Sequence, residues 1–196
     1  MAVGYIRVGD FWYRLDGRGK MDVTPTPTPT DGDVYKLLAS TEVAGSAVTS
    51  VDFTGLSLDS DDELLLVSDI AAPISTTNVY LYVNGNTTNT NYYRQLLWAY
   101  SNNIGENRVN DAFIDYTQSG SGSLIESYIK LTSDGYIAFQ SKATNNYGSS
   151  SVDIMNCYNT TLFTDASITQ LTISTSVASQ ILSGSKFWLY RINKEV

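Results

Sequence analysis

The sequence predicts an all-β protein: a jelly-roll-like antiparallel β-sandwich preceded by a short N-terminal β-hairpin and a Pro/Thr linker. The composition favours strands, because 14 tyrosines occur with recurrent valine, isoleucine and threonine, and such side chains pack well on a pleated surface. Short runs with strand-like alternation follow one another along most of the chain, separated by turn residues and with no convincing helical pattern between them. This succession is typical of a β-sandwich or jelly roll.

The linker is the string Thr24–Thr30, in which proline alternates with threonine and which holds three of the four prolines. Proline lacks an N–H and fixes φ, so this string cannot join a sheet or a helix. It favours an extended rod of roughly 3 Å per residue. We therefore expect three parts: an anchoring hairpin at residues 1–23, a linker at 24–30 and a β-sandwich domain at 31–196.

Within the first part, residues 4–8 and 11–15 read as two strands joined by Gly9 and Asp10, a pair that favours a tight hairpin turn. An isolated hairpin is marginal in water, and this one is unusually apolar. It must pack on its own domain, on sister subunits or on a partner. The expected anchoring residues are Tyr5, Arg7, Val8, Phe11, Trp12 and Tyr13.

The larger part is expected to hold eleven strands. Their predicted ranges are 34–39, 47–53, 63–70, 79–83, 92–100, 112–116, 123–131, 136–142, 152–158, 168–175 and 186–192. The Leu64–Val67 run predicts a strand buried on both faces. Asn84-Gly85 predicts a hairpin turn after residues 79–83, with 92–100 as the returning strand. Residues 180–183 suggest a short helical turn.

Charge restricts the partners. The net charge is −8, and no lysine or arginine occurs between Lys36 and Arg94, where seven acidic residues lie. Such a domain repels nucleic acid and anionic membranes. No stretch resembles a signal peptide or a membrane span. We expect synthesis in a cytosol, no binding of nucleic acid and no membrane insertion.

Few residues offer catalytic chemistry. The absence of histidine removes the commonest general base and the usual zinc ligand. Cys157 is the only cysteine and lies in a strand-like run, which favours a buried, inert thiol. A carboxylate pair of the glycosidase type stays open, although surface charges explain the acidic residues better. The sequence predicts no enzyme, no cofactor and no metal site.

An acidic cluster at residues 59–63 has oxygen ligands of the kind that suit Ca²⁺. Its spacing lacks the central glycine and the distal bidentate glutamate of a helix–loop–helix calcium site. A polar turn ahead of the strand at residues 63–70 is the favoured interpretation.

One strand is rich in aromatic and amide side chains. Alternation places Tyr92, Arg94, Trp98 and Tyr100 on one face of it. Ring faces can stack on sugars and amides can bond their hydroxyls, so these four residues are candidates for glycan contact. Packing in a core or between subunits is the alternative, and such patterns more often indicate it.

Several segments, taken in their order, carry a resemblance: residues 51–56, 82–86, 91–94, 168–173 and 184–192, with Tyr5–Tyr13 near the N-terminus. This arrangement resembles tailed-bacteriophage virion structural proteins, namely tail or head fibre and capsid decoration proteins with a C-terminal β-sandwich. Asp10 stands where the family's N-terminal segment has its second glycine. The resemblance implies a structural role on a virion and often a trimer.

The resulting hypothesis is a non-enzymatic virion protein, made in the host bacterial cytoplasm. It is expected to form a short homotrimeric fibre that attaches to other virion proteins through residues 1–23. Its β-sandwich then faces outward, where a host surface glycan is a candidate contact. The alternatives are a cement or decoration protein that stabilises the capsid, and a carbohydrate-binding module.

Overall fold

The computed structural model describes the backbone of residues 4–8, 11–15, 21–22, 34–100, 103–147 and 151–192. The chain divides into two compact units, Met1–Asp31 and Gly32–Val196. In the first unit, β1 (Gly4–Val8) pairs antiparallel with β2 (Phe11–Leu15), with Val8 opposite Phe11. The predicted hairpin is thus confirmed. A short strand, β3 (Met21–Asp22), adds to β2. The side chains of the expected anchoring residues lie outside the described part.

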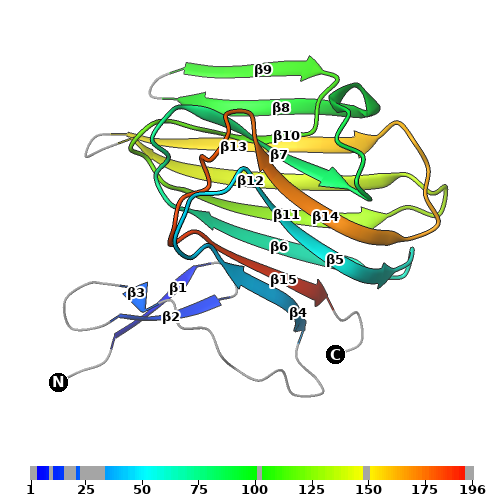
Figure 1. Ribbon diagram of the computed structural model, residues 1–196, viewed down its shortest axis with the longest axis horizontal. Coiled ribbons are helices and arrows are strands. Elements are labelled where there is room, and N and C mark those ends of the chain that lie inside the picture. The colour runs from blue at the N-terminus through cyan, green and yellow to red at the C-terminus, as the bar shows by residue number, and fades with distance from the viewer. Residues whose placement is uncertain are drawn as a thin grey trace. The chain divides into compact units, whose positions relative to one another are not determined.

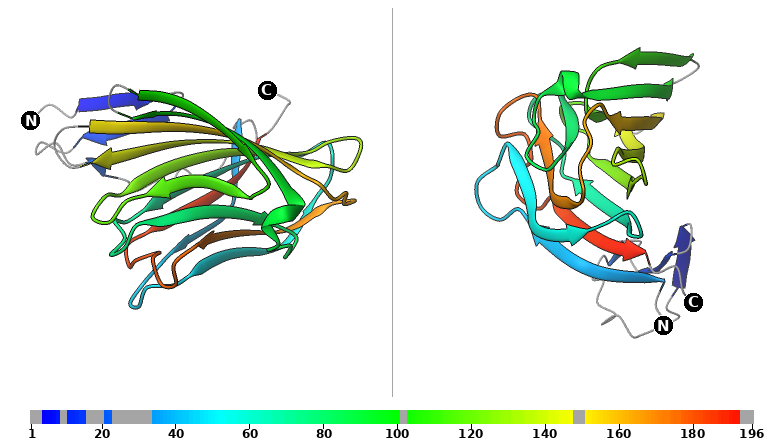
Figure 2. Two further views of the ribbon diagram at one scale, coloured as in Figure 1. Left: turned by 90° about the horizontal axis from the view of Figure 1, so that it is seen from above. Right: turned by 90° about the vertical axis from the view of Figure 1, so that its right-hand side faces the viewer.

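The second unit is a sandwich of two antiparallel sheets, so the predicted all-β fold is confirmed (Figures 1 and 2). The smaller sheet has the order β10-β7-β14-β5, and the larger one has the order β4-β15-β6-β11-β12-β13-β8-β9. The strands are β4 (Tyr35–Glu42), β5 (Ser50–Leu58), β6 (Glu63–Ile70), β7 (Thr77–Val83), β8 (Tyr92–Tyr100), β9 (Asn103–Val109), β10 (Phe113–Thr117), β11 (Ser123–Leu131), β12 (Ile137–Tyr147), β13 (Ser151–Thr161), β14 (Ile168–Thr175) and β15 (Lys186–Ile192).

The strand order is that of a jelly roll with two insertions. Strands β4-β15-β6-β11 form one half and β5-β14-β7-β10 the other. Successive framework strands alternate between the halves, except that β7 and β10 are neighbours in one sheet. Eight strands arranged in this way make a double Greek key. The β8–β9 and β12–β13 hairpins are additional, and both extend the larger sheet beyond β11.

The core lies between the sheets and follows from period-two alternation. In β11 the side chains of Ser123, Ile125, Ser127, Ile129 and Leu131 are buried, while those between them are half-buried or exposed. The predicted two-sided burial is also confirmed, since Leu64, Leu65 and Leu66 are at most 1% exposed. The described part of the chain has no helix with the length and apolarity needed to cross a bilayer.

Three details differ from the sequence predictions. Strand β9 was not expected, because it has few apolar residues; its cross-strand partner is β8. Asn84 and Gly85 do form a tight turn, with φ of 52° and 70°, but the chain then crosses to the other sheet, where the predicted returning strand lies as β8. Residues 180–183 form no helix, because Ile181 exchanges backbone hydrogen bonds with Val48.

Candidate functional site

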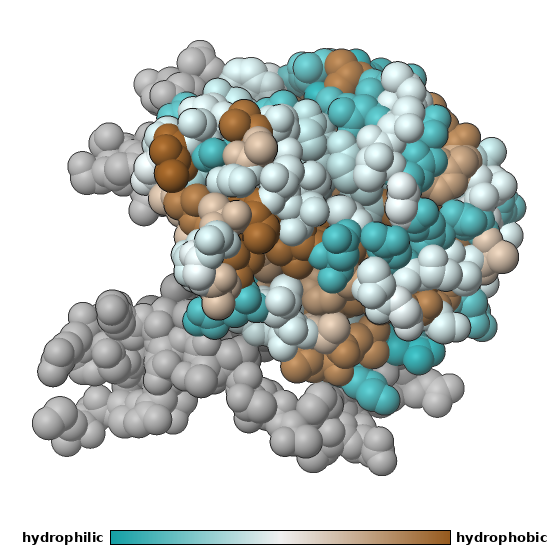
Figure 3. All heavy atoms as spheres, viewed as in Figure 1, coloured by the Kyte–Doolittle hydropathy of each residue, from teal (hydrophilic) through white to brown (hydrophobic). Residues whose placement is uncertain are grey.

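The two sheets present different outward faces. The side in front in Figure 3, over the four-stranded sheet, is largely hydrophilic or neutral, with apolar atoms gathered mainly toward one side. The face of the eight-stranded sheet that points away from the four-stranded sheet, here the outer face, carries a series of large apolar side chains. Each is 40–45% exposed: Tyr93, Leu97, Leu124, Tyr128, Ile154 and Tyr158. This series of exposed apolar side chains makes the outer face the candidate contact surface.

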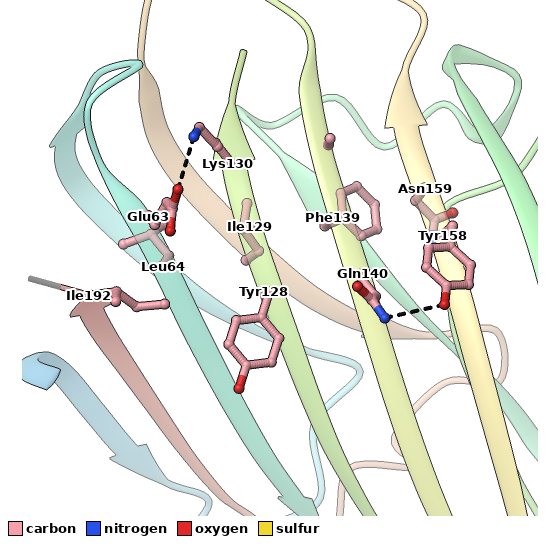
Figure 4. A pocket seen from close by; sticks show the side chains of 11 residues that line it. Glu63, Leu64, Tyr128, Ile129, Lys130, Phe139, Gln140, Tyr158, Asn159 and Ile192 are labelled. Carbon is pink, nitrogen blue, oxygen red and sulfur yellow. Dashed lines mark hydrogen bonds and ion pairs between the residues drawn. The ribbon is translucent and has the colours of Figure 1, made fainter. Parts of the chain in front are cut away.

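Register places the outward side chains of four central strands in rows across this face. Tyr128 of β11 is opposite Gln140 of β12, which is opposite Tyr158 of β13. Strand spacing puts the backbones of the two tyrosines about 9–10 Å apart. Their rings therefore flank the Gln140 amide, as Figure 4 shows.

A hollow of about 380 Å³ opens beside this row. In the next row Ala138 lies between Lys130 of β11 and Thr160 of β13. Its methyl group is shorter than the side chains around it, most of all that of Lys130, so a depression forms over it. The lining residues are Glu63, Leu64, Tyr128, Ile129, Lys130, Ala138, Phe139, Gln140, Tyr158, Asn159 and Ile192. This volume falls in the range typical of small-ligand sites, at its lower end.

The polar groups of the hollow are already oriented. Gln140 Nε2 donates to the Tyr158 hydroxyl at 3.3 Å. Lys130 Nζ donates to Glu63 Oε1 at 2.9 Å, and both of these side chains are partly exposed. One cation and one anion leave the lining without net charge. The hollow therefore suits a neutral ligand with hydroxyl groups better than a strongly anionic or cationic one.

The hollow is built on paired strands of the larger sheet, near the ends of β6, β11 and β15, rather than on loops. Strand β11 pairs with β6 and β12, and β12 pairs with β11 and β13. On the opposite side of these strands, buried Ile129 and Phe139 pack into the core. Sites on paired strands hold their side chains more precisely than sites on loops. The arrangement is therefore preorganised for contact.

The candidate glycan residues proposed from the sequence lie elsewhere. Tyr92 is fully buried and Arg94 is 5% exposed, because the face of β8 that carries them points into the sandwich. These two residues are not available to a surface glycan, which corrects that expectation. Trp98 is partly buried against the core, and the side chain of Tyr100 lies outside the described residues. Core packing, the alternative interpretation, applies to Tyr92 and Arg94.

Tyr92 has a structural role at the crossing between the sheets. Its hydroxyl accepts from the Val83 N–H at 2.9 Å and donates to the Asn86 carbonyl at 2.7 Å. Its ring meets Phe139 and Phe163 edge-on. Burial raises the pKa of Tyr92 to about 12, so the hydroxyl stays protonated and able to donate.

Arg94 neutralises an acidic residue inside the sandwich rim. Its Nε lies 2.9 Å from Asp111 Oδ1, as an ion pair rather than a well-aligned hydrogen bond. Its guanidinium also lies 4.4 Å from the centre of the Phe113 ring. Burial raises the pKa of Asp111, and the charge of Arg94 opposes that rise. The Arg94 guanidinium therefore makes its contacts inside the sandwich, with Asp111 and Phe113.

The other residues with possible chemistry are structural. Cys157 is a free, buried cysteine, as expected, and burial raises the pKa of its thiol to about 12. Such a thiol is a poor nucleophile. In the acidic segment, Asp59 accepts from the Asp61 N–H and Asp62 pairs with Arg191, which confirms the polar turn. Within the described residues, no three or more Cys, Asp or Glu side chains are grouped so as to hold a metal ion.

The sequence did not single out Tyr128, Gln140 or Tyr158. The signal was present, however, because Asp134-Gly135 is a pair of residues that favours a tight turn between two strands. A hairpin closed at that turn pairs residue 131 with 137 and therefore 128 with 140, as observed.

No protein-family model and no curated protein matches this chain.

Proposed function

We propose that this protein is a non-enzymatic structural protein of a tailed-bacteriophage virion. It forms a short homotrimeric fibre: the N-terminal unit docks on other virion proteins and the jelly roll faces outward. A capsid cement or decoration protein with the same organisation is the alternative within this class.

The observation that carries the proposal is the division of the chain into a small and a large compact unit, residues 1–31 and 32–196. The proline-rich segment Thr24–Thr30 lies at the end of the small unit and favours an extended spacer. A small sheet followed by a spacer and a compact jelly roll suits an anchored, projecting protein. Jelly rolls are common in virion and lectin domains, which supports the proposal at the level of the fold alone.

A second candidate function, carbohydrate binding, is favoured by the hollow on the outer face. Two tyrosines, an amide and an exposed ion pair meet there on adjacent strands (Figure 4). Lectin-like recognition and a fibre role are compatible, because a projecting domain that contacts a host surface needs a binding face.

Particle assembly tests the virion proposal. Particles produced with the full chain are expected to carry it, and antibody labelling in electron micrographs should place it on the head or the tail. Deletion of residues 1–23 is expected to remove the protein from particles while leaving the jelly roll folded. Normal incorporation of the deletion variant would refute the anchoring role, and absence of the full chain from particles would refute the virion assignment.

A further inference from the structure

We infer that the hollow between Tyr128, Ala138 and Tyr158 is a binding site for a neutral oligosaccharide. The site deepens the second proposed function, on which it rests, and replaces the four β8 residues that the sequence suggested. Its ligand is a chain of uncharged sugars lying across strands β11, β12 and β13.

The aromatic groups give the first reason. Tyr128 and Tyr158 are 45% and 44% exposed on the outer face, and they stand two strands apart in one row. Exposed tyrosine rings held on a rigid sheet offer apolar faces at little entropic cost. Sugar rings carry apolar C–H faces of matching size, so two such rings can support separate sugar units of one chain.

The polar groups give the second reason. Between the rings, the Gln140 amide keeps one N–H and its carbonyl beyond the bond to Tyr158. Lys130 and Glu63 add charged donors and acceptors at the edge of the hollow. Sugar hydroxyls both donate and accept, so this mixture of groups can satisfy them. An anionic polymer is less suitable, because the single lysine is already paired with Glu63.

The shape gives the third reason. Ala138 leaves a depression among the longer outward side chains of Lys130, Gln140 and Tyr158. The Tyr128–Gln140–Tyr158 row crosses the strands, and the next row, with Lys130 and Ala138, runs parallel to it. Sugar units can therefore lie side by side along the two rows, as binding of an extended chain requires.

Binding can be measured on the full-length protein with three uncharged probes: the hexamers of β-1,4-glucose, β-1,4-N-acetylglucosamine and α-1,6-mannose. Saturation-transfer NMR and calorimetry are expected to detect binding of at least one hexamer at sugar concentrations below 10 mM. Tyr158→Ala is expected to weaken that binding about tenfold or more, since aromatic anchors dominate such contacts. Tyr158→Phe keeps the ring and should weaken it less.

Ala138→Leu fills the hollow without removing either tyrosine, and it is expected to abolish binding. Tyr116→Ala is the matched control: Tyr116 is 37% exposed but belongs to the four-stranded sheet, so binding should stay unchanged. Circular dichroism and the unfolding midpoint verify that each variant is folded.

Two results would overturn the inference. One is that none of the three hexamers binds at 10 mM. The other is that Ala138→Leu and Tyr158→Ala leave sugar binding intact but convert an oligomer to a monomer, which would assign the hollow to a second copy of the chain. Both are read on purified protein and are independent of particle incorporation, so failure here and failure of the virion proposal are distinguishable.

Discussion

The indole of Trp98 lies directly against Gly105 of the neighbouring edge strand. A β-carbon on residue 105 would come within 2.3 Å of Cζ2 of that ring, closer than two such atoms can approach. Trp98 and Gly105 are cross-strand partners in the β8–β9 pair. The absent side chain at position 105 is thus what lets the indole cover the end of the larger sheet.

This contact makes Gly105→Ala destabilising. The ring or strand β9 must move, and overpacking of this kind costs about 1–3 kcal/mol. Urea unfolding should show the loss as a lower midpoint. The double variant Trp98→Ala/Gly105→Ala removes the clash, so its loss should be clearly smaller than the sum of the two single losses. Strict additivity would contradict the proposed contact.

Removal of the Tyr92 hydroxyl should also destabilise the fold. Tyr92→Phe leaves the buried Val83 N–H without its acceptor and the Asn86 carbonyl without its donor, at a cost of about 1–3 kcal/mol. Thermal and urea unfolding measure the change. Tyr93→Phe, on the exposed side of the same strand, is the control and should be neutral. Equal effects of the two substitutions would refute this role.

Stability should depend on pH through Asp115. This carboxyl group is fully buried and accepts from Ser123 at 2.5 Å, Asn145 at 2.8 Å and Thr117 at 3.0 Å. Burial raises its pKa above the usual 3.8 despite these donors. The folded state thus holds its proton more tightly than the unfolded state does.

The sign of the effect follows from proton linkage. The contribution of protonated Asp115 to the free energy of unfolding is fully present below its unfolded-state pKa. It is lost as the pH rises through its folded-state pKa. Asp115→Asn cannot titrate, so its stability relative to wild type should rise over that interval. Urea unfolding at a series of pH values from 3 upward isolates Asp115 from Asp69 and Asp111, whose pKa values are also raised. A difference that does not change with pH would refute the prediction.

The full chain is expected to be a trimer, with a mass three times 21.5 kDa in light scattering. Closed homo-oligomers are the usual means of covering apolar surface, and Ile104 on edge strand β9 is 87% exposed. We expect Ile104→Lys to weaken the oligomer and Glu106→Lys, on the same strand, to matter less. A mass of one chain for the wild type at micromolar concentration would refute the trimer.

The fold class could be predicted from the sequence because alternation and turn residues are local signals. Ser123–Leu131 was predicted at its exact bounds for that reason. The sheet to which each strand belongs could not be predicted from the sequence, because it depends on pairing between strands that are far apart along the chain. Asn84 and Gly85 form the predicted turn, yet β7 and β8 belong to different sheets.

The same dependence on long-range packing explains why Tyr92 and Arg94 were wrongly predicted to contact a glycan. Alternation separated the two faces of β8 correctly, but it could not tell which face meets the core. Tyr92 and Arg94 proved to be on the buried side. Strand β9 was missed because Asn103–Val109 has only Ile104 and Val109 as large apolar residues, so it lacks the alternation that marks a strand; it pairs along β8 at the edge of the sheet.

The position of the hollow has a consequence for how ligand preference at the proposed sugar site can change between related chains. Three of the strands that line it, β6, β11 and β15, belong to the jelly-roll framework, whereas β12 and β13 form an inserted hairpin. Outward positions of that hairpin, such as Ala138, Gln140 and Tyr158, can accumulate substitutions while its inward positions preserve the packing. In the proposed sugar site, one part of the lining therefore belongs to the scaffold and the other part is exchangeable, so substitutions in the hairpin can change ligand preference while the architecture is retained.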